Sequence, residues 1–144
     1  MTISTNRKAN YEYHIIEQWV AGIVLFGSEV KSVRAGNVNM ADSFIYMKDG
    51  EVWLKNLKIA RYSQMHPSDK HEDNRDKKLL LTKKQIQKIS KELQNTGITC
   101  IPLSVFIQKN KIKVNIAVVK GKKNYDKRQS IKERDIKREL HRNL

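Results

Sequence analysis

The segment SFIYMKDGEVWLKN, residues 43–56, is the strongest local indication of fold in this chain. Two runs rich in β-branched and aromatic residues, 43–48 and 51–56, flank Asp49-Gly50. Asp-Gly tolerates the positive φ angles that a two-residue hairpin turn requires. The segment therefore predicts two antiparallel strands joined by a tight turn.

A second hairpin is predicted downstream, from Ile98–Gln108 and Lys111–Val119. In its second strand apolar residues alternate with mostly polar ones, which indicates a half-buried strand with a basic outer face. The apolar set is Ile112, Val114, Ile116 and Val118, and the intervening set is Lys111, Lys113, Asn115 and Ala117.

A helix is predicted between the two hairpins, over Thr82–Asn95. Thr82 and Gln85 form a T-x-x-Q capping box at its start, and Gly97 stops it. Three apolar residues share one face at helical spacing: Ile86, Ile89 and Leu93.

Upstream of residue 43 the pattern predicts one or two strands over Tyr11–Phe26, broken near Ala21-Gly22. Ser28 is suited to cap a short helix that runs to about Arg34 and ends at Gly36. We expect a short strand within residues 57–62 and a long, mobile polar loop over 65–78.

These elements predict a mainly β fold, a small antiparallel OB-related β-barrel with two or three flanking helices. We divide the chain into a flexible N-terminal arm at 1–10, a barrel domain at 11–119 and a basic tail at 120–144. The tail holds ten Lys or Arg and four Asp or Glu, a net charge of +6 in 25 residues, whereas residues 1–119 carry +8. We expect it to be disordered alone, with a helix from about 131 to 140 on a partner.

The charge balance favours a polyanionic partner, with 29 Lys or Arg against 15 Asp or Glu and a net charge of +14. Nucleic acid is the first candidate and an anionic membrane the second. Membrane association is disfavoured because no apolar run approaches the roughly 20 residues of a span. Because the first ten residues are polar, we expect no signal peptide, and Cys100 is the single cysteine. We expect a cytoplasmic monomer.

Catalytic and metal-binding patterns are weak, so we predict no enzyme activity, no metal and no cofactor. His66 and His71 are five residues apart, which is not a recognised ligand spacing, and Asp42, Asp49 and Glu51 fit turn formation and surface charge. Cations suited to phosphate are more numerous: Arg7, Lys8, Lys31, Arg34, Arg75, Lys77, Lys78, Lys83 and Lys84, with Asn6 beside them. Exposed aromatics could stack on unpaired bases, and the candidates are Tyr11, Tyr13, Trp19 and Tyr62.

Several sequence blocks stand out, in this order: N-R-K-A at 6–9, A-G-I at 21–23, G-S-E-V-K-S-V-R-A-G at 27–36, D-S-F at 42–44, D-G-E at 49–51, K-L-L-L at 78–81, G-K-K-N-Y-D-K-R at 121–128 and I-K-E-R at 131–134. Taken together, in this order, they resemble the SsrA-binding protein (SmpB, small protein B) family. The resemblance covers most of the chain, from about residue 6 to 138.

The resemblance implies an OB-related barrel that binds the tRNA-like domain of transfer-messenger RNA. It also implies a tail that enters the empty decoding centre and mRNA channel of a stalled ribosome, contacting small-subunit ribosomal RNA. Elongation factor Tu would be a partner only indirectly, through the charged RNA. The implied RNA-binding residues are Asn6, Arg7, Lys8, Lys31, Arg34, Leu79, Leu80, Leu81, Lys83 and Lys84. The implied ribosome contacts are Gly121, Lys122, Lys123, Tyr125, Asp126, Lys127, Arg128, Ile131, Lys132 and Arg134.

The chain departs from the family pattern at a few positions. Val20 stands where many members have a glutamate that is assigned to RNA recognition, and Thr82 replaces a common His or Asn. The tail ends soon after Leu140 and is short for the family. Two other functions remain open at this point: a general OB-type ribosomal or translation-factor protein that binds ribosomal RNA, and a metal-dependent nuclease acting on structured RNA.

Overall fold

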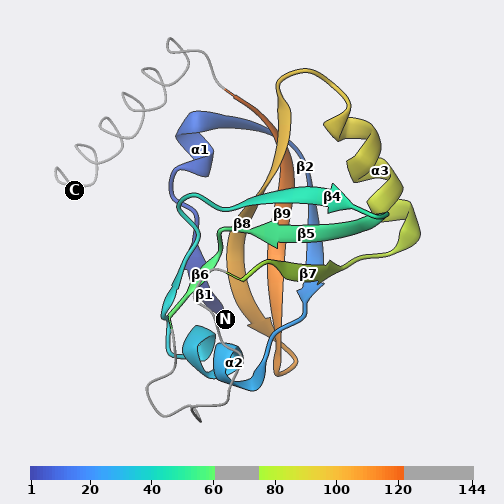
Figure 1. Ribbon diagram of the computed structural model, residues 1–144. Coiled ribbons are helices and arrows are strands. Elements are labelled where there is room, and N and C mark those ends of the chain that lie inside the picture. Colours follow the sequence, from blue (N-terminus) through green and yellow to red (C-terminus); the bar gives the residue numbers. More distant parts are fainter. Residues whose placement is uncertain (61–74, 122–144) are drawn as a thin grey trace, which may run out of the picture.

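The computed structural model describes residues 1–60 and 75–121 (Figure 1). Its elements, in chain order, are β1 Thr2–Thr5, α1 Ala9–Glu12, β2 Tyr13–Ile23, α2 Gly27–Arg34, β3 Val38–Asn39, β4 Phe44–Lys48, β5 Glu51–Lys55, β6 Lys58–Ile59, β7 Lys77–Leu80, α3 Lys83–Leu93, β8 Ile98–Gln108 and β9 Lys111–Gly121.

One large antiparallel sheet dominates the fold, with the strand order β1-β8-β4-β5-β7-β2-β9 and a further pairing of β8 with β9. Strands β3 and β6 form a separate two-stranded sheet. Figure 1 shows β4, β5 and β7 crossing in front of the long strands β2, β8 and β9. The prediction of a mainly β, antiparallel fold with flanking helices is confirmed, and closure into a barrel stays a prediction.

Both predicted hairpins are present, and the positive φ angles that were predicted for Asp49-Gly50 occur in both turns. Asp49 and Gly50 have φ angles of 53° and 75° between β4 and β5, and Lys109 and Asn110 have 50° and 62° between β8 and β9. Positive φ at both central residues matches the right-handed twist of the strands. The turns therefore set the register of the two hairpins.

The predicted helix is α3, and its capping box is formed as expected. The Thr82 N–H donates to the Gln85 side chain at 3.0 Å, and the Gln85 N–H donates to the Thr82 hydroxyl at 3.3 Å. Ile89 is fully buried, and Ile86 and Leu93 pack against the core from the same face. The apolar stripe thus fixes α3 against the sheet, where it contacts β8 and β9.

The core lies between the crossing strands, and along β5 and the first half of β9 every second side chain points into it. On β5, Val52 and Leu54 point inward, and on β9 Val114 and Ile116 do the same, all at 0% exposure. Apolar burial of this kind stabilises a fold by about 25 cal/mol for each Å² removed from water. It also gives the loops and turns around the core a rigid support.

The N-terminal segment differs from the flexible arm that we expected for residues 1–10. Thr2–Thr5 form β1, which pairs with β8 through Thr2 and Phe106, and the Asn6 N–H donates to the Leu103 carbonyl at 2.8 Å. Backbone pairing with an edge strand depends little on side chains, so the polar sequence concealed it. The helix α1 replaces the expected start of a strand at Tyr11.

Three smaller predictions were wrong. β2 runs unbroken through Ala21-Gly22, with its one register shift between Ile15 and Glu17. Helix α2 is capped at Phe26, not Ser28, because the Glu29 carboxylate accepts the Phe26 N–H at 2.7 Å. Residues 77 and 78 of the expected mobile loop belong to β7, and residues 61–74 lie outside the described part of the chain.

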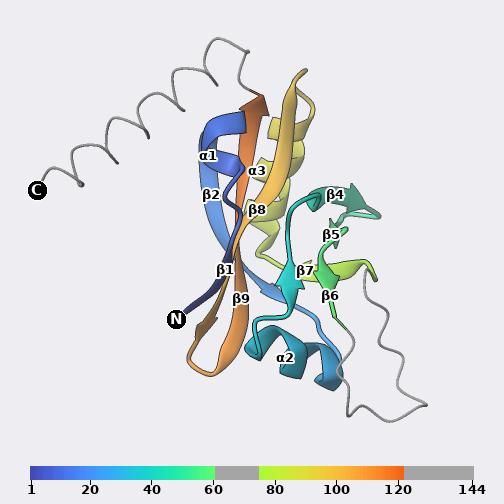
Figure 2. The ribbon, with the colours of Figure 1, turned by 90° about the vertical axis from the view of Figure 1, so that its left-hand side faces the viewer.

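The helices occupy different ends of the molecule. Figures 1 and 2 agree that α2 lies at the lower end, near the β8–β9 turn, and that α1 and α3 lie in the upper half. None of the helices in the described ranges is long and apolar enough to cross a membrane.

Candidate nucleic-acid interface

The N-terminal block divides into a structural residue and two exposed cations. The Asn6 amide donates to the Pro102 carbonyl at 3.0 Å, so this side chain anchors the chain to β8. Arg7 and Lys8 follow in an exposed turn, beside a groove of about 340 Å³ that also includes residues 38–41. Arg7 and Lys8 are therefore accessible to RNA, whereas the Asn6 side chain stabilises the fold through its hydrogen bond to β8.

Helix α2 also divides by face. Glu29 and Ser32 are buried, whereas Lys31 and Arg34 are exposed. An Arg34 guanidinium N–H donates to the Asn110 carbonyl at 3.1 Å, which ties the end of α2 to the β8–β9 turn. The sequence block at 27–36 thus supplies both a buried anchor and two surface cations.

The buried anchor is Glu29, whose carboxylate is fully inaccessible and forms an ion pair with Arg75. Arg75 Nε lies 3.3 Å from the second carboxylate oxygen, and the guanidinium lies 4.2 Å from the centroid of the Phe26 ring. This arrangement joins the start of α2 to the segment that enters β7. Arg75, a candidate phosphate contact from the sequence, is a structural residue.

The next two cations are also held within the fold. Lys77 is fully buried and donates to the Leu57 carbonyl at 2.8 Å and to the Arg75 carbonyl at 2.6 Å. Lys78 forms an ion pair with Glu51 at 2.9 Å. A lysine's charge does not indicate on which side of a strand it lies, which is why the sequence suggested a solvated loop here.

The leucine block at 79–81 contains both buried and exposed side chains, and the start of α3 is exposed. Leu79 is 2% exposed and belongs to the core, so a direct RNA contact is incompatible with its position. Leu80 is 54% exposed and lies opposite Gly22, and Leu81 packs partly against the core. Lys83 and Lys84 are exposed in the first turn of α3.

The aromatic residues that we expected to be exposed are mostly engaged. Tyr13 packs against a small cluster around Ala9, and Trp19 packs against the main core. Tyr11 is half-buried, and Tyr62 lies outside the described residues.

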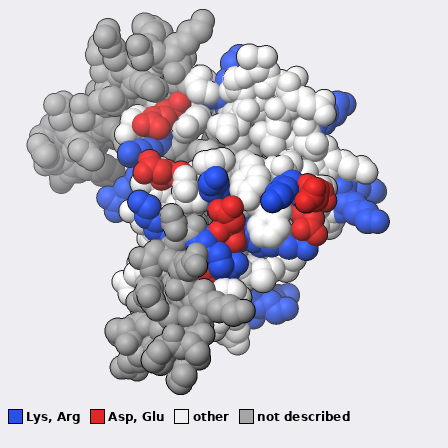
Figure 3. All heavy atoms as spheres, viewed as in Figure 1, with Lys and Arg blue, Asp and Glu red and all other residues white. Residues whose placement is uncertain are grey.

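An aromatic row that the sequence did not single out lies on the outer face of β4 and β5. Phe44 and Tyr46 have ring centroids 6.4 Å apart, and Tyr46 pairs in register with Trp53. The Tyr46 hydroxyl donates to Asp76 at 2.8 Å, and this hydrogen bond raises the pKa of Tyr46, aided by burial and the nearby charge. Figure 3 shows acidic and basic groups side by side on this face. It lacks the positive excess expected of a phosphate-binding surface.

Accessible candidate residues therefore form separate groups. Arg7 and Lys8 precede α1, Lys31 and Arg34 lie on α2, and Leu80, Lys83 and Lys84 lie on β7 and α3. The lysines at the β8–β9 turn were not among the residues singled out from the sequence, although the alternation had placed Lys111 and Lys113 on an outer face. In residues 1–60 and 75–121, no group of three His, Cys, Asp or Glu could hold a metal ion.

Of the ten expected ribosome contacts, only Gly121 is described, as the exposed last residue of β9. The others, from Lys122 to Arg134, lie outside the described residues.

Comparison with known proteins gives a consistent result. The family described as SmpB protein matches residues 3–144. An SsrA-binding protein of Persephonella marina is 48% identical, with 96% of this chain and 90% of the relative covered. One of Ligilactobacillus salivarius is 47% identical, with 99% and 91% covered. A solved chain described as "tmRNA-SmpB: a journey to the center of the bacterial ribosome" superposes with a TM-score of 0.70 at 34% identity, covering 89% of this chain and 93% of the other.

Proposed function

Because the chain belongs to the SsrA-binding protein (SmpB) family, we propose that it is the RNA-binding adaptor of trans-translation. It binds the tRNA-like domain of transfer-messenger RNA and delivers that RNA to stalled bacterial ribosomes, so that the nascent peptide is tagged for degradation. Elongation factor Tu participates through the charged RNA. The observation that carries the proposal is the extent of the family match, residues 3–144. The match spans both the folded part, by which we mean the elements from β1 to β9, and the basic tail that follows it.

The folded part holds transfer-messenger RNA in this proposal. Exposed candidates on regular elements support it: Leu80 on β7, and Lys83 and Lys84 on α3. Arg7 and Lys8 add two exposed cations in the turn before α1. Side chains fixed on strands and helices bind with less loss of conformational freedom than side chains on loops. Asn6, Glu29 and Leu79 act on RNA only indirectly, by holding these elements in place.

The tail occupies the vacant decoding centre and the mRNA channel. Its residues from 120 to 144 have a net charge of +6, which suits a passage lined by ribosomal RNA phosphates. Segments of this composition fold when they meet a partner, and the ordering cost is then offset by many charge contacts. We assign this role to residues 121–128 and 131–134.

The proposed activity is binding, with no catalytic step of its own, by a monomer in the bacterial cytoplasm. A reconstituted translation reaction on an mRNA without a stop codon tests it, with transfer-messenger RNA and elongation factor Tu present. We expect addition of the protein to release the stalled peptide with its tag, measured by gel mobility and mass spectrometry.

Two controls make the outcome decisive. Without transfer-messenger RNA, no tag should form, and RNA recovered after incubation with Mg²⁺ should be intact. Cleaved RNA would instead identify a nuclease. Binding to the ribosome with no tagging under any condition would contradict the adaptor role and favour a general ribosomal RNA-binding protein.

A further inference from the structure

A groove of about 480 Å³ runs between helix α3 and the β4–β5 hairpin. Met47 and Gly50 line it from the hairpin, and α3 lines it along its length, from Lys83 to Gln94. Its floor is apolar, since Met47 and Ile86 are both half-buried and pack against the core. We call this hollow the α3 groove. Apart from Lys83 at its edge, none of the RNA contacts proposed above lies in it.

Two lysines of α3 line this groove without an acid beside them. Lys83 and Lys91 make no side-chain hydrogen bond or ion pair with any other residue of 1–60 and 75–121. Lys88, on the same helix, is instead paired with Glu17 at 2.9 Å. The helical rise puts Lys83 and Lys91 about 12 Å apart along α3. A complementary occupant therefore has an apolar stripe with carboxylates at a similar spacing.

The basic tail contains a segment of this kind at residues 133–144, which lie outside the described part of the chain. Apolar residues recur there at every fourth position, which gives a single stripe in a helix: Ile136, Leu140 and Leu144. Glu133 and Glu139 are each three residues from Ile136, so they border the same stripe. One side of this helix would thus match the apolar floor and the lysines of the α3 groove.

The arginines of the segment lie on the opposite side of the same helix. They also recur at every fourth position, offset by two residues from the apolar stripe: Arg134, Arg138 and Arg142. Residues two positions apart do not face the same way on a helix. A channel lined by RNA phosphates accounts for the arginines, but it leaves Glu133 and Glu139 without a role.

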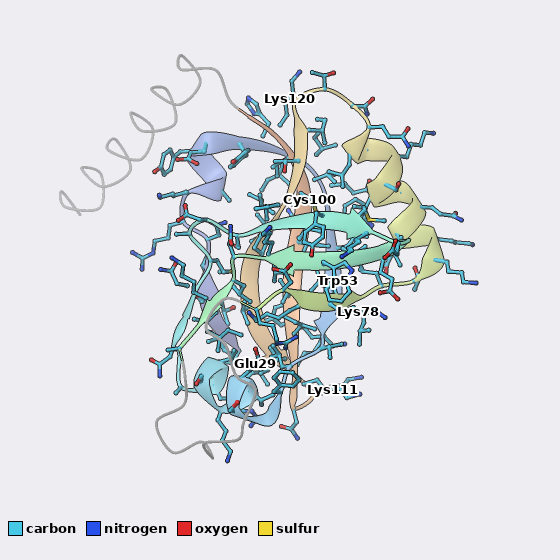
Figure 4. All side chains as sticks on the ribbon, viewed as in Figure 1. Glu29, Trp53, Lys78, Cys100, Lys111 and Lys120 are labelled. Carbon is cyan, nitrogen blue, oxygen red and sulfur yellow. The ribbon has the colours of Figure 1, made fainter. Side chains whose placement is uncertain are left out.

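The tail leaves the fold next to one end of the α3 groove. Lys120 pairs with Ile98 between β9 and β8, and the Ile98 N–H donates to the Asn95 carbonyl at 3.3 Å, one residue beyond the groove. Figure 4 shows Lys120 at the upper end of the molecule, where the loop from α3 enters β8. Residues 122–132 can extend over about 36 Å, whereas the groove follows about 16 Å of α3. A helix of residues 133–144 is about 18 Å long, so it can be placed along the whole groove.

We propose that in the free protein the tail docks on the folded part, with residues 133–144 as a helix in the α3 groove. The apolar stripe covers the floor, and the helix runs antiparallel to α3. Glu133 then lies beside Lys91. Glu139, about 9 Å further along the helix, lies within reach of Lys83. This docked tail replaces the disordered free tail that the composition suggested.

The charges keep this docking weak and reversible. The tail carries +6 and residues 1–119 carry +8, so the general repulsion opposes the two local ion pairs. The arginine side faces solvent in the docked state and is free to meet RNA phosphates. The proposal rests on the proposed function only for what displaces the tail, which is ribosomal RNA. A helix that is already formed has less conformational freedom to lose when the tail enters the channel.

The test is paramagnetic NMR on the full chain without RNA. A nitroxide is attached to a His141→Cys variant, on the arginine side of the tail helix, since Cys100 is buried and shielded from the reagent. We expect amide signals at the groove, including those of Gly50 and Gln87, to be broadened. The amide of Gln108, at the β8–β9 turn in the lower end of the molecule, should be unaffected. Circular dichroism and thermal melting check that each variant folds.

Matched substitutions separate docking from mere proximity. Ile136→Ser should lower the docking equilibrium constant on the order of 10- to 100-fold, because one apolar side chain is no longer buried. Ile131→Ser, the same change on the far side of the helix, should leave the broadening as it was. Lys91→Glu should weaken docking roughly 3- to 10-fold, and adding Glu133→Lys should restore it. The same charge change at the exposed Lys58, on β6, should have little effect.

Several results would overturn the proposal. One is no broadening at the groove, or broadening that is as strong on other surfaces. Another is an equal effect of Ile136→Ser and Ile131→Ser. Broadening seen only in a mixture of nitroxide-labelled and isotope-labelled chains would assign the groove to the tail of a second copy. Because neither RNA nor ribosomes are present, a failure of tagging leaves these outcomes unchanged, so the two proposals fail independently.

Discussion

Replacing Glu29 by glutamine is expected to destabilise the fold strongly, although the two side chains have nearly the same shape. The carboxylate is 0% exposed and accepts from the Phe26 N–H at 2.7 Å and from two guanidinium N–H groups of Arg75. Glutamine can keep the bond to Phe26, but its amide NH₂ would face an Arg75 donor. The variant thus leaves a partly buried guanidinium without its counter-ion.

The expected cost follows from that geometry. Removing one partner of a buried ion pair typically costs about 3–5 kcal/mol, and Arg75 remains 23% exposed, so water recovers part of its solvation. We expect a loss of about 3 kcal/mol in the free energy of unfolding. For a chain of this length that corresponds to a fall in Tm of about 6–12 °C.

Urea denaturation followed by tryptophan fluorescence, together with thermal melting, measures the effect. The matched control is Glu51→Gln, because Glu51 is paired with Lys78 at the surface, where an ion pair contributes less than about 1 kcal/mol. A Glu29→Gln protein within about 0.5 kcal/mol of the wild type would refute the reasoning that Glu29 anchors α2 through Arg75.

Three further predictions concern other parts of the chain. Burial raises the pKa of the Cys100 thiol to about 12, from an ordinary value of 9.0, so the folded protein should resist alkylation at pH 8. The thiol ionises at a lower pH in the unfolded protein than in the folded protein. The contribution of the buried, neutral thiol to the free energy of unfolding is therefore complete below pH 9 and is lost as the pH rises from 9 to 12. Stability should therefore fall by about 1 kcal/mol more in the wild type than in Cys100→Ala between pH 8 and 10, by urea titration. Gly50→Ala should cost about 1 kcal/mol in the same assay, because φ is +75° in open space, whereas Gly27→Ala should change little. Deleting residues after Lys123 should spare binding to free transfer-messenger RNA and abolish tagging, and a loss of free-RNA affinity beyond the effect of charge would argue against two separate functions.

The elements that could be predicted from sequence are those whose signals are local. The β4–β5 hairpin depends on Asp49-Gly50, and α3 depends on the reciprocal bonds of Thr82 and Gln85 and on its apolar stripe. Each signal is complete within a few residues, so no knowledge of distant partners was needed. The same holds for the alternation along β9 from Ile112 to Ile116, whereas Ala117, which was expected on the outer face, is fully buried in a second, smaller cluster.

The features that could not be predicted depend on contacts between distant segments. β1 exists because β8, about 100 residues away, offers an edge, and Arg75 and Glu29 meet across 46 residues. A lysine is expected at the surface, yet the Lys77 ammonium group is buried and donates to the backbone carbonyls of Leu57 and Arg75. A family resemblance identified the blocks correctly, but it could not separate the residues that hold the fold from those that can reach RNA.

The central claim is that the folded part recognises a particular RNA shape, in addition to attracting polyanions through its charge of +14. The most direct test measures binding of the full chain to the isolated tRNA-like domain of transfer-messenger RNA, to a tRNA and to a plain RNA duplex, at two salt concentrations. We predict a preference for the tRNA-like domain that persists at the higher salt concentration. Equal affinity for all three RNAs, falling steeply and in parallel with salt, would contradict the account.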